Sequence, residues 1–83
     1  MIPNYLINDP AFSQEALCAL VWMLHQEGEY MFRVADVKKR FGWGDWIWRR
    51  VSLELEKRGL VHHKRVQGRV RIMFNDKVKG YIN

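Results

Sequence analysis

The chain has 83 residues, 48% of them hydrophobic, and a single cysteine, which supports one folded domain and excludes a disordered tail, an internal disulfide and a membrane span. Residues 1–32 contain four acids and no Lys or Arg, whereas residues 33–83 contain five acids and all 14 cations. Residues 1–32 therefore have a net charge of −4 and residues 33–83 one of +9. This asymmetry is typical of a protein with one strongly positive face, which nucleic acid or an anionic surface would bind.

Residues 1–12 form the first predicted segment, an irregular arm with two prolines. Its start lacks a basic stretch followed by an apolar run, so we expect no signal peptide. Three consecutive apolar side chains, Tyr5, Leu6 and Ile7, predict that the arm packs along the domain.

A first helix is predicted over residues 13–27, with Ser13 as its N-cap and Gly28 after its end. Its main apolar stripe faces the core, but Cys18 and Trp22 lie on another side. We expect this second apolar side to be covered, either by the arm and tail of the same chain or by a second copy in a homodimer. The surface predicted for either arrangement consists of Cys18, Trp22, Tyr5 and Tyr81.

A short strand at residues 30–32 and a second helix over residues 34–41 follow. A turn bracketed by two glycines then leads into a third helix over residues 45–58, one side of which is an apolar stripe. The opposite side combines two large apolar side chains with three cations, namely Trp46, Leu53, Arg49, Arg50 and Lys57. A face that only needed solvation would not hold a Trp and a Leu among cations, so we expect it to bind a partner.

After Gly59 the apolar period changes from helical to alternating, which predicts a β-hairpin over residues 60–74 with a two-residue turn at Gln67-Gly68. A polar tail over residues 75–83 follows. The order of helix, short strand, helix, turn, helix and hairpin is that of a winged helix-turn-helix domain, an α+β fold with three helices. In this fold the short strand would join the hairpin as a third strand, and the whole chain would form one domain.

A series of short motifs runs in order from Ile2 to about Leu60. They are Ile2-Pro3-Asn4, Leu6, Asp9, Ser13, Ala16, Tyr30 to Phe32, Lys39-Arg40-Phe41-Gly42, Leu55-Glu56 and Gly59-Leu60. This ordered set resembles the helix-turn-helix domain at the N-terminus of many phage and plasmid replication proteins. The sequence departs from that pattern at Ser52, where the family has a core Leu. The resemblance implies a small DNA-binding regulator of transcription or replication in the cytoplasm of a bacterial host cell.

Double-stranded DNA is the partner that we expect, with the third helix in the major groove and the basic hairpin on the backbone or minor groove. Arg49 and Arg50 are the candidates for bidentate guanine contacts, and the other cations are candidates for phosphate contacts. The predicted DNA-binding residues are Lys38, Lys39, Trp46, Arg49, Arg50, Lys57, Lys64, Arg65, Arg69 and Arg71.

Catalysis, cofactors and metals have little support in the sequence. The histidines, His25, His62 and His63, lack the spacing of a metal site, and no glycine-rich phosphate loop or nucleophile elbow is present. We therefore expect no enzyme and no cofactor. The alternative function is a protein-binding module, for example an inhibitor of a host nucleic-acid-binding complex, because exposed Trp, Leu and Arg also form protein hot spots. RNA is a further candidate partner.

Overall fold

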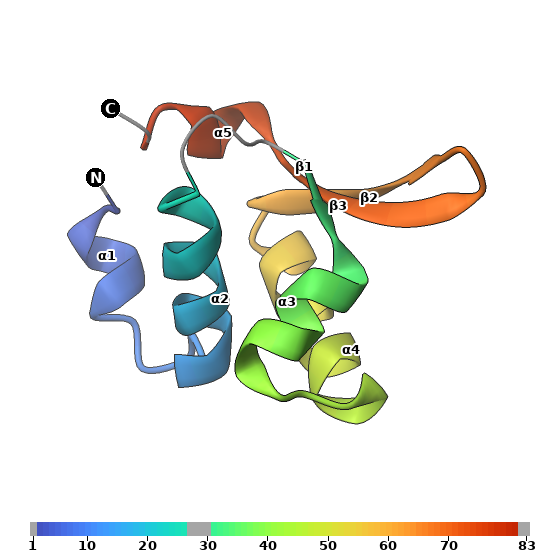
Figure 1. Cartoon of the computed structure of the whole chain (residues 1–83). Coiled ribbons are helices and arrows are strands. Elements are labelled where there is room, and N and C mark those ends of the chain that lie inside the picture. Colours follow the sequence, from blue (N-terminus) through green and yellow to red (C-terminus); the bar gives the residue numbers. More distant parts are fainter. Residues whose placement is uncertain (1, 27–30, 82–83) are drawn as a thin grey trace.

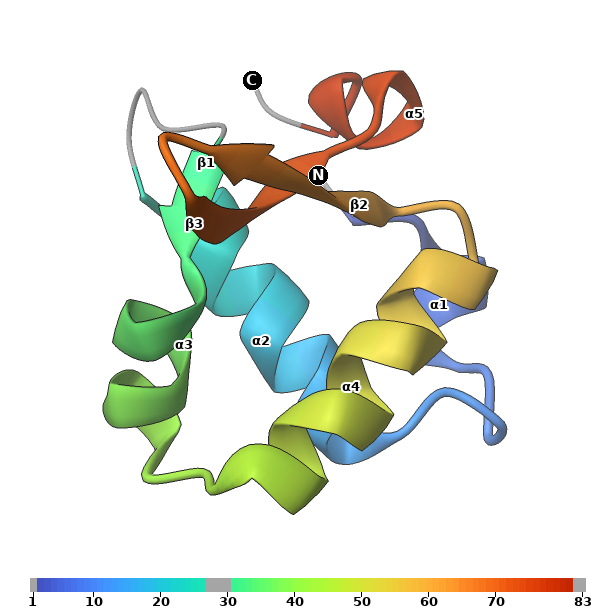
Figure 2. The same cartoon turned by 90° about the vertical axis from the view of Figure 1, so that its right-hand side faces the viewer.

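The computed structural model describes residues 2–26 and 31–81 as a small α+β domain with an antiparallel sheet (Figure 1). Its five helices and three strands within these ranges are α1 (Asn4–Ile7), α2 (Gln14–Leu24), β1 (Met31–Arg33), α3 (Val34–Phe41), α4 (Asp45–Lys57), β2 (Val61–Val66), β3 (Arg69–Phe74) and α5 (Asp76–Lys79). Helices α2, α3 and α4 lie on one side of the sheet (Figure 2). The predicted α+β class is confirmed.

The prediction of three helices is wrong, because the arm and the tail each contain one helical turn. α1 occupies the predicted irregular arm, and α5 occupies the predicted polar tail. Each of these turns buries one side chain, Leu6 in α1 and Val78 in α5. A helix of four residues is too short to show a repeat of 3.6 residues, so the apolar pattern could not reveal it.

The helix α2 begins at the predicted cap and ends before the predicted stop. The Ser13 hydroxyl accepts a hydrogen bond from the Ala16 N–H at 3.2 Å. The helix ends at Leu24 rather than at residue 27, and His25 is its C-cap. Beyond that cap the Gln26 side-chain amide donates to the Trp22 carbonyl at 2.9 Å, which satisfies a carbonyl that another helical turn would have used.

The segment from β1 to α4 has tight connections. β1 ends at Arg33, one residue later than predicted, and both the predicted strand residue Tyr30 and the predicted stop Gly28 lie outside the described residues. α3 follows β1 directly and ends at Phe41. Gly42 caps it with a left-handed φ of +70°, which suits a residue without Cβ. The next helix, α4, ends at Lys57, one residue earlier than predicted.

The sheet has the strand order β1-β3-β2, so the hairpin strands β2 and β3 are extended by β1 on the β3 side. The hairpin turn is Gln67-Gly68, and both of its residues have positive φ. Such a turn matches the twist of the two strands. The register places Phe32 of β1 opposite Ile72 of β3.

The core lies between the sheet and the helices α2 and α4. Phe32 and Phe74 meet edge to face with their ring centroids 5.5 Å apart. Ser52 of α4 is also buried, at the position where the resembled family has a Leu, and its hydroxyl donates to the Arg49 carbonyl at 3.2 Å. A small polar side chain whose hydroxyl is hydrogen-bonded therefore lies at this point of the core.

Truncation of Leu6 tests whether the arm is part of the core. The Leu6 side chain is 2% exposed and that of Ile7 is 49% exposed, although both belong to α1. We expect Leu6→Ala to lower the free energy of unfolding by about 2–4 kcal/mol, because the change leaves a cavity. The matched control Ile7→Ala should lower it by less than about 1 kcal/mol. Urea unfolding measures both, and equal losses would contradict a packed arm.

Candidate functional site

The exposed side of α4 carries the largest apolar side chain that the described residues present to solvent. Trp46 is 79% exposed, and Leu53, two turns further along the same side, is 49% exposed. The opposite side of α4 is buried and faces α2 and the sheet through Trp48, Val51 and Leu55. The sequence placed these two sides correctly, because the helix keeps a regular period over its thirteen residues.

Arg50 is held by an acid of another helix. Its guanidinium donates to the Glu15 carboxylate of α2 at 2.8 Å, and this hydrogen bond lowers the pKa of Glu15 below its ordinary value. The pair joins the edge of the exposed side of α4 to α2. Of the two arginines predicted to contact bases, Arg49 is therefore the one without an ion pair among the described residues.

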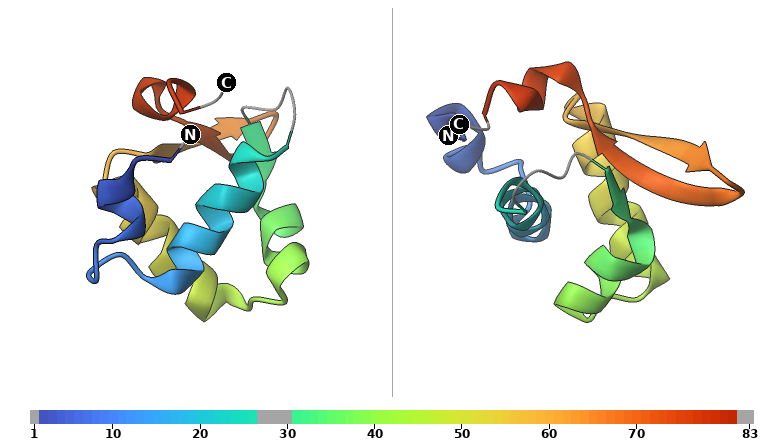
Figure 3. Two further views of the ribbon diagram at one scale, coloured as in Figure 1. Left: turned by 90° about the vertical axis from the view of Figure 1, so that its left-hand side faces the viewer. Right: turned by 45° about the horizontal axis from the view of Figure 1, so that its top comes forward.

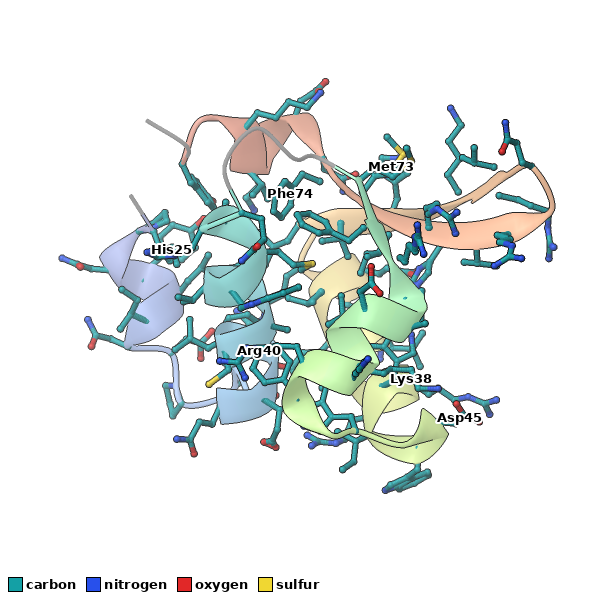
Figure 4. All side chains as sticks on the ribbon, in the orientation of Figure 1. His25, Lys38, Arg40, Asp45, Met73 and Phe74 are labelled. Carbon is teal, nitrogen blue, oxygen red and sulfur yellow. The ribbon has the colours of Figure 1, made fainter. Side chains whose placement is uncertain are left out.

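Lys38 of α3 forms an ion pair with Asp45 across the turn between α3 and α4 (Figure 4). The hydrogen bond from Lys38 lowers the pKa of Asp45. Lys39 and Lys57 have no carboxylate partner within the described part of the chain. Lys38 thus fixes the turn that sets the direction of α4, whereas Lys39 and Lys57 keep their charge available.

The cations of the hairpin are divided between the two faces of the sheet. Lys64 of β2 and Arg71 of β3 are register partners and point to the same face. Arg65 lies next to Lys64 in the strand and points to the other face, where its guanidinium donates to the Gly68 carbonyl at 3.1 Å. No carboxylate pairs with Lys64, Arg65, Arg69 or Arg71 in the ranges that the structure describes.

His63 joins α4 to the sheet, which the sequence did not predict. Its imidazole pairs with the Glu56 carboxylate of α4 and meets the Trp48 ring edge to face, with centroids 6.3 Å apart. The neighbouring His62 points to the other face and bonds the Asn75 side chain. Alternation along β2 predicts that the two histidines separate, but only the packing shows which one meets α4.

The four residues predicted to form one dimer or lid surface do not all come together. The Tyr5 and Tyr81 hydroxyls lie 3.3 Å apart. Burial of the Tyr81 hydroxyl and, to a smaller extent, this hydrogen bond raise the pKa of Tyr81 to about 12. Trp22 instead packs against the rings of Phe32 and Phe41, and Cys18 is exposed. Arm and tail therefore cover each other rather than Cys18, and the homodimer stays a prediction.

Within residues 2–26 and 31–81, no cluster of three His, Cys, Asp or Glu side chains is placed to hold a metal ion. No helix among them combines the length and the apolar character needed to cross a bilayer. Comparison of the chain with protein-family models, with curated proteins and with solved structures gave no match in any of the three. Inference about the site therefore rests on its own residues.

Titration of Glu15 tests the pairing that occupies Arg50. In Arg50→Gln we expect the pKa of Glu15 to rise toward its ordinary value, whereas Arg49→Gln should leave it unchanged. The folded-state pKa lies below the unfolded one, so the pair stabilises the fold above the ordinary glutamate pKa. That contribution is lost as the pH falls through the folded-state pKa. Carboxyl NMR titration measures the shift, and an unchanged Glu15 in Arg50→Gln would contradict the pair.

Proposed function

We propose that this chain is a winged helix-turn-helix protein that binds double-stranded DNA and regulates transcription or replication. The observation that carries the proposal is a group of cations on α4 and the hairpin that have no carboxylate partner within the described residues. Its members are Arg49, Lys57, Lys64, Arg65, Arg69 and Arg71. Some other cations are paired, as Arg58 is with Asp9 at 2.7 Å, whereas Lys39 and Lys77 have no carboxylate partner in the described ranges but lie on α3 and α5.

The arrangement of α4 and the hairpin supports this proposal. Trp46 and Arg49 lie in the first half of α4, and the N-terminal residues of a recognition helix are those that contact base edges in the major groove. The hairpin projects beyond the helices, as the right panel of Figure 3 shows. A projecting hairpin can reach a phosphate backbone that α4 itself does not touch. Arg49 is the proposed base contact, and the hairpin cations are the proposed phosphate contacts.

The dependence of affinity on salt tests the proposed contact with DNA. If about five phosphates are neutralised, log K against log salt should have a slope near −4 to −5 on a random duplex. Arg69→Gln should make this slope shallower by about 0.9, because one phosphate contact is lost. The matched control is Lys77→Gln, which removes an equal charge from α5. A slope near zero for the unchanged protein would contradict the proposed binding to DNA.

Arg49→Gln tests base readout rather than charge. On a duplex selected from a random pool, we expect the substitution to cost about 1–3 kcal/mol and to relax the choice of one base. Arg69→Gln should weaken selected and random duplexes by the same factor. Equal losses on both duplexes for Arg49→Gln would assign Arg49 to phosphate instead.

The exposure of Trp46 favours a second candidate function, a protein-binding module. An indole that is 79% exposed beside an exposed Leu53 has the composition of a protein hot spot. Under this function Trp46→Ala should abolish capture of a partner from bacterial lysate. Capture by the unchanged protein should persist at a salt concentration that releases DNA. Arg69→Gln is the control that should leave capture unchanged. A partner lost equally with both variants would argue for capture through nucleic acid.

A further inference from the structure

Three cations form a row across the sheet at one level of its register. Arg33 of β1 lies opposite Arg71 of β3, and Arg71 lies opposite Lys64 of β2. Directly opposed residues of antiparallel strands point to the same face, so the three side chains share one face. Neighbouring strands are about 4.8 Å apart, which places the first and last backbone positions of the row about 10 Å apart.

This row lies on the face of the sheet turned away from the core. Phe32 and Ile72 alternate with the row and are buried, so the row itself points outward. Figure 4 shows the same alternation, with Met73 and Phe74 on opposite sides of β3. Because α4 meets the inner face through His63, the row is separated from α4 by the thickness of the sheet.

The row carries an uncompensated electrostatic cost. Like charges directly opposite one another destabilise a sheet, and none of the three cations pairs with a carboxylate within the described residues. Arg71 makes only a 3.5 Å contact with the Val70 carbonyl. A bound anion would remove this repulsion.

A cavity of about 770 Å³ continues the row past the edge of β1. Its lining includes Arg33 and Arg71 from the row, Lys39 and Arg40 from α3, and one carboxylate, Asp36. Asp36 forms no ion pair among the described residues, so the four cations around it keep a net positive charge. Four cations against one acid among the described lining residues give the cavity a positive potential, which favours anions.

We propose that Lys64, Arg71, Arg33, Lys39 and Arg40 form a phosphate-binding surface, the sheet site, which extends the proposed hairpin contacts of Lys64 and Arg71 across the sheet to β1 and α3 and binds a stretch of DNA backbone that α4 does not touch. The ligand class rests on the proposed function, since a phosphodiester backbone presents anions at regular intervals. Arginine recognises phosphate bidentately, and two of the three residues of the row are arginines. Arg33 is central, because it belongs both to the row and to the cavity.

Arg33→Gln in the full chain tests the sheet site. Arg33 is exposed and makes no side-chain cap to α3, so the substitution leaves the fold in place. With inorganic pyrophosphate as the probe, we expect the Arg33 and Arg71 guanidinium NMR signals to shift and saturate. Arg33→Gln should weaken this binding about tenfold, as loss of a charged hydrogen bond does. Lys64→Gln should weaken it as well, whereas the control Lys77→Gln should not.

The same variants on a short duplex separate this proposal from the proposed function. If the duplex binds and Arg33→Gln matches Lys77→Gln with both ligands, the sheet site is wrong and DNA binding stands. If pyrophosphate binds at Arg33 but no duplex binds at low salt, the phosphate site stands and the proposed function falls. Tighter binding of polyglutamate than of the duplex at Arg33 would overturn the choice of a phosphodiester ligand.

Discussion

The packing of α4 between α2 and the sheet is the constraint on which the rest of the structure depends. Trp48, Val51 and Leu55 bury one side of this helix, and the acids beside that side bond to neighbouring elements. Glu54 accepts the Ser13 backbone N–H at 2.6 Å on the α2 side, and Glu56 pairs with a histidine on the sheet side. Glu54 and Glu56 are thus directed toward neighbouring elements, and the opposite side of α4 carries Trp46, Leu53 and cations.

Two ion pairs between the acidic first part of the chain and the basic second part determine where positive charge remains on the surface. Asp9 and Glu15, from the acidic first part, neutralise Arg58 and Arg50 at the side of α4 nearest to α2. Neither Asp9 nor Glu15 forms an ion pair with the hairpin, whose cations therefore keep their positive charge. Net charge alone would suggest that the whole second part of the chain is positive, but the pairing lowers the charge on the side of α4 nearest to α2 and leaves the sheet and the outer side of α4 positive.

Long regular patterns made part of this fold predictable from sequence. The alternation after Gly59 and the turn Gln67-Gly68 located the hairpin, and the helical period located the exposed side of α4. The pairing of Arg50 with Glu15 spans 35 positions, and no local pattern encodes it. The row through Arg33 depends on the register of β1 against β3, which a strand of three residues does not specify by itself.

The contact between Tyr5 and Tyr81 closes the chain upon itself, because it joins residues that are 76 positions apart. A single helical turn has little stability of its own in water, so α1 and α5 depend on contacts with the rest of the domain, among them the burial of Leu6 and Val78 and this contact. Loss of either turn removes a support of the other. We therefore expect α1 and α5 to behave as one cooperative unit, whose amide hydrogens would become exposed to exchange in the same opening event.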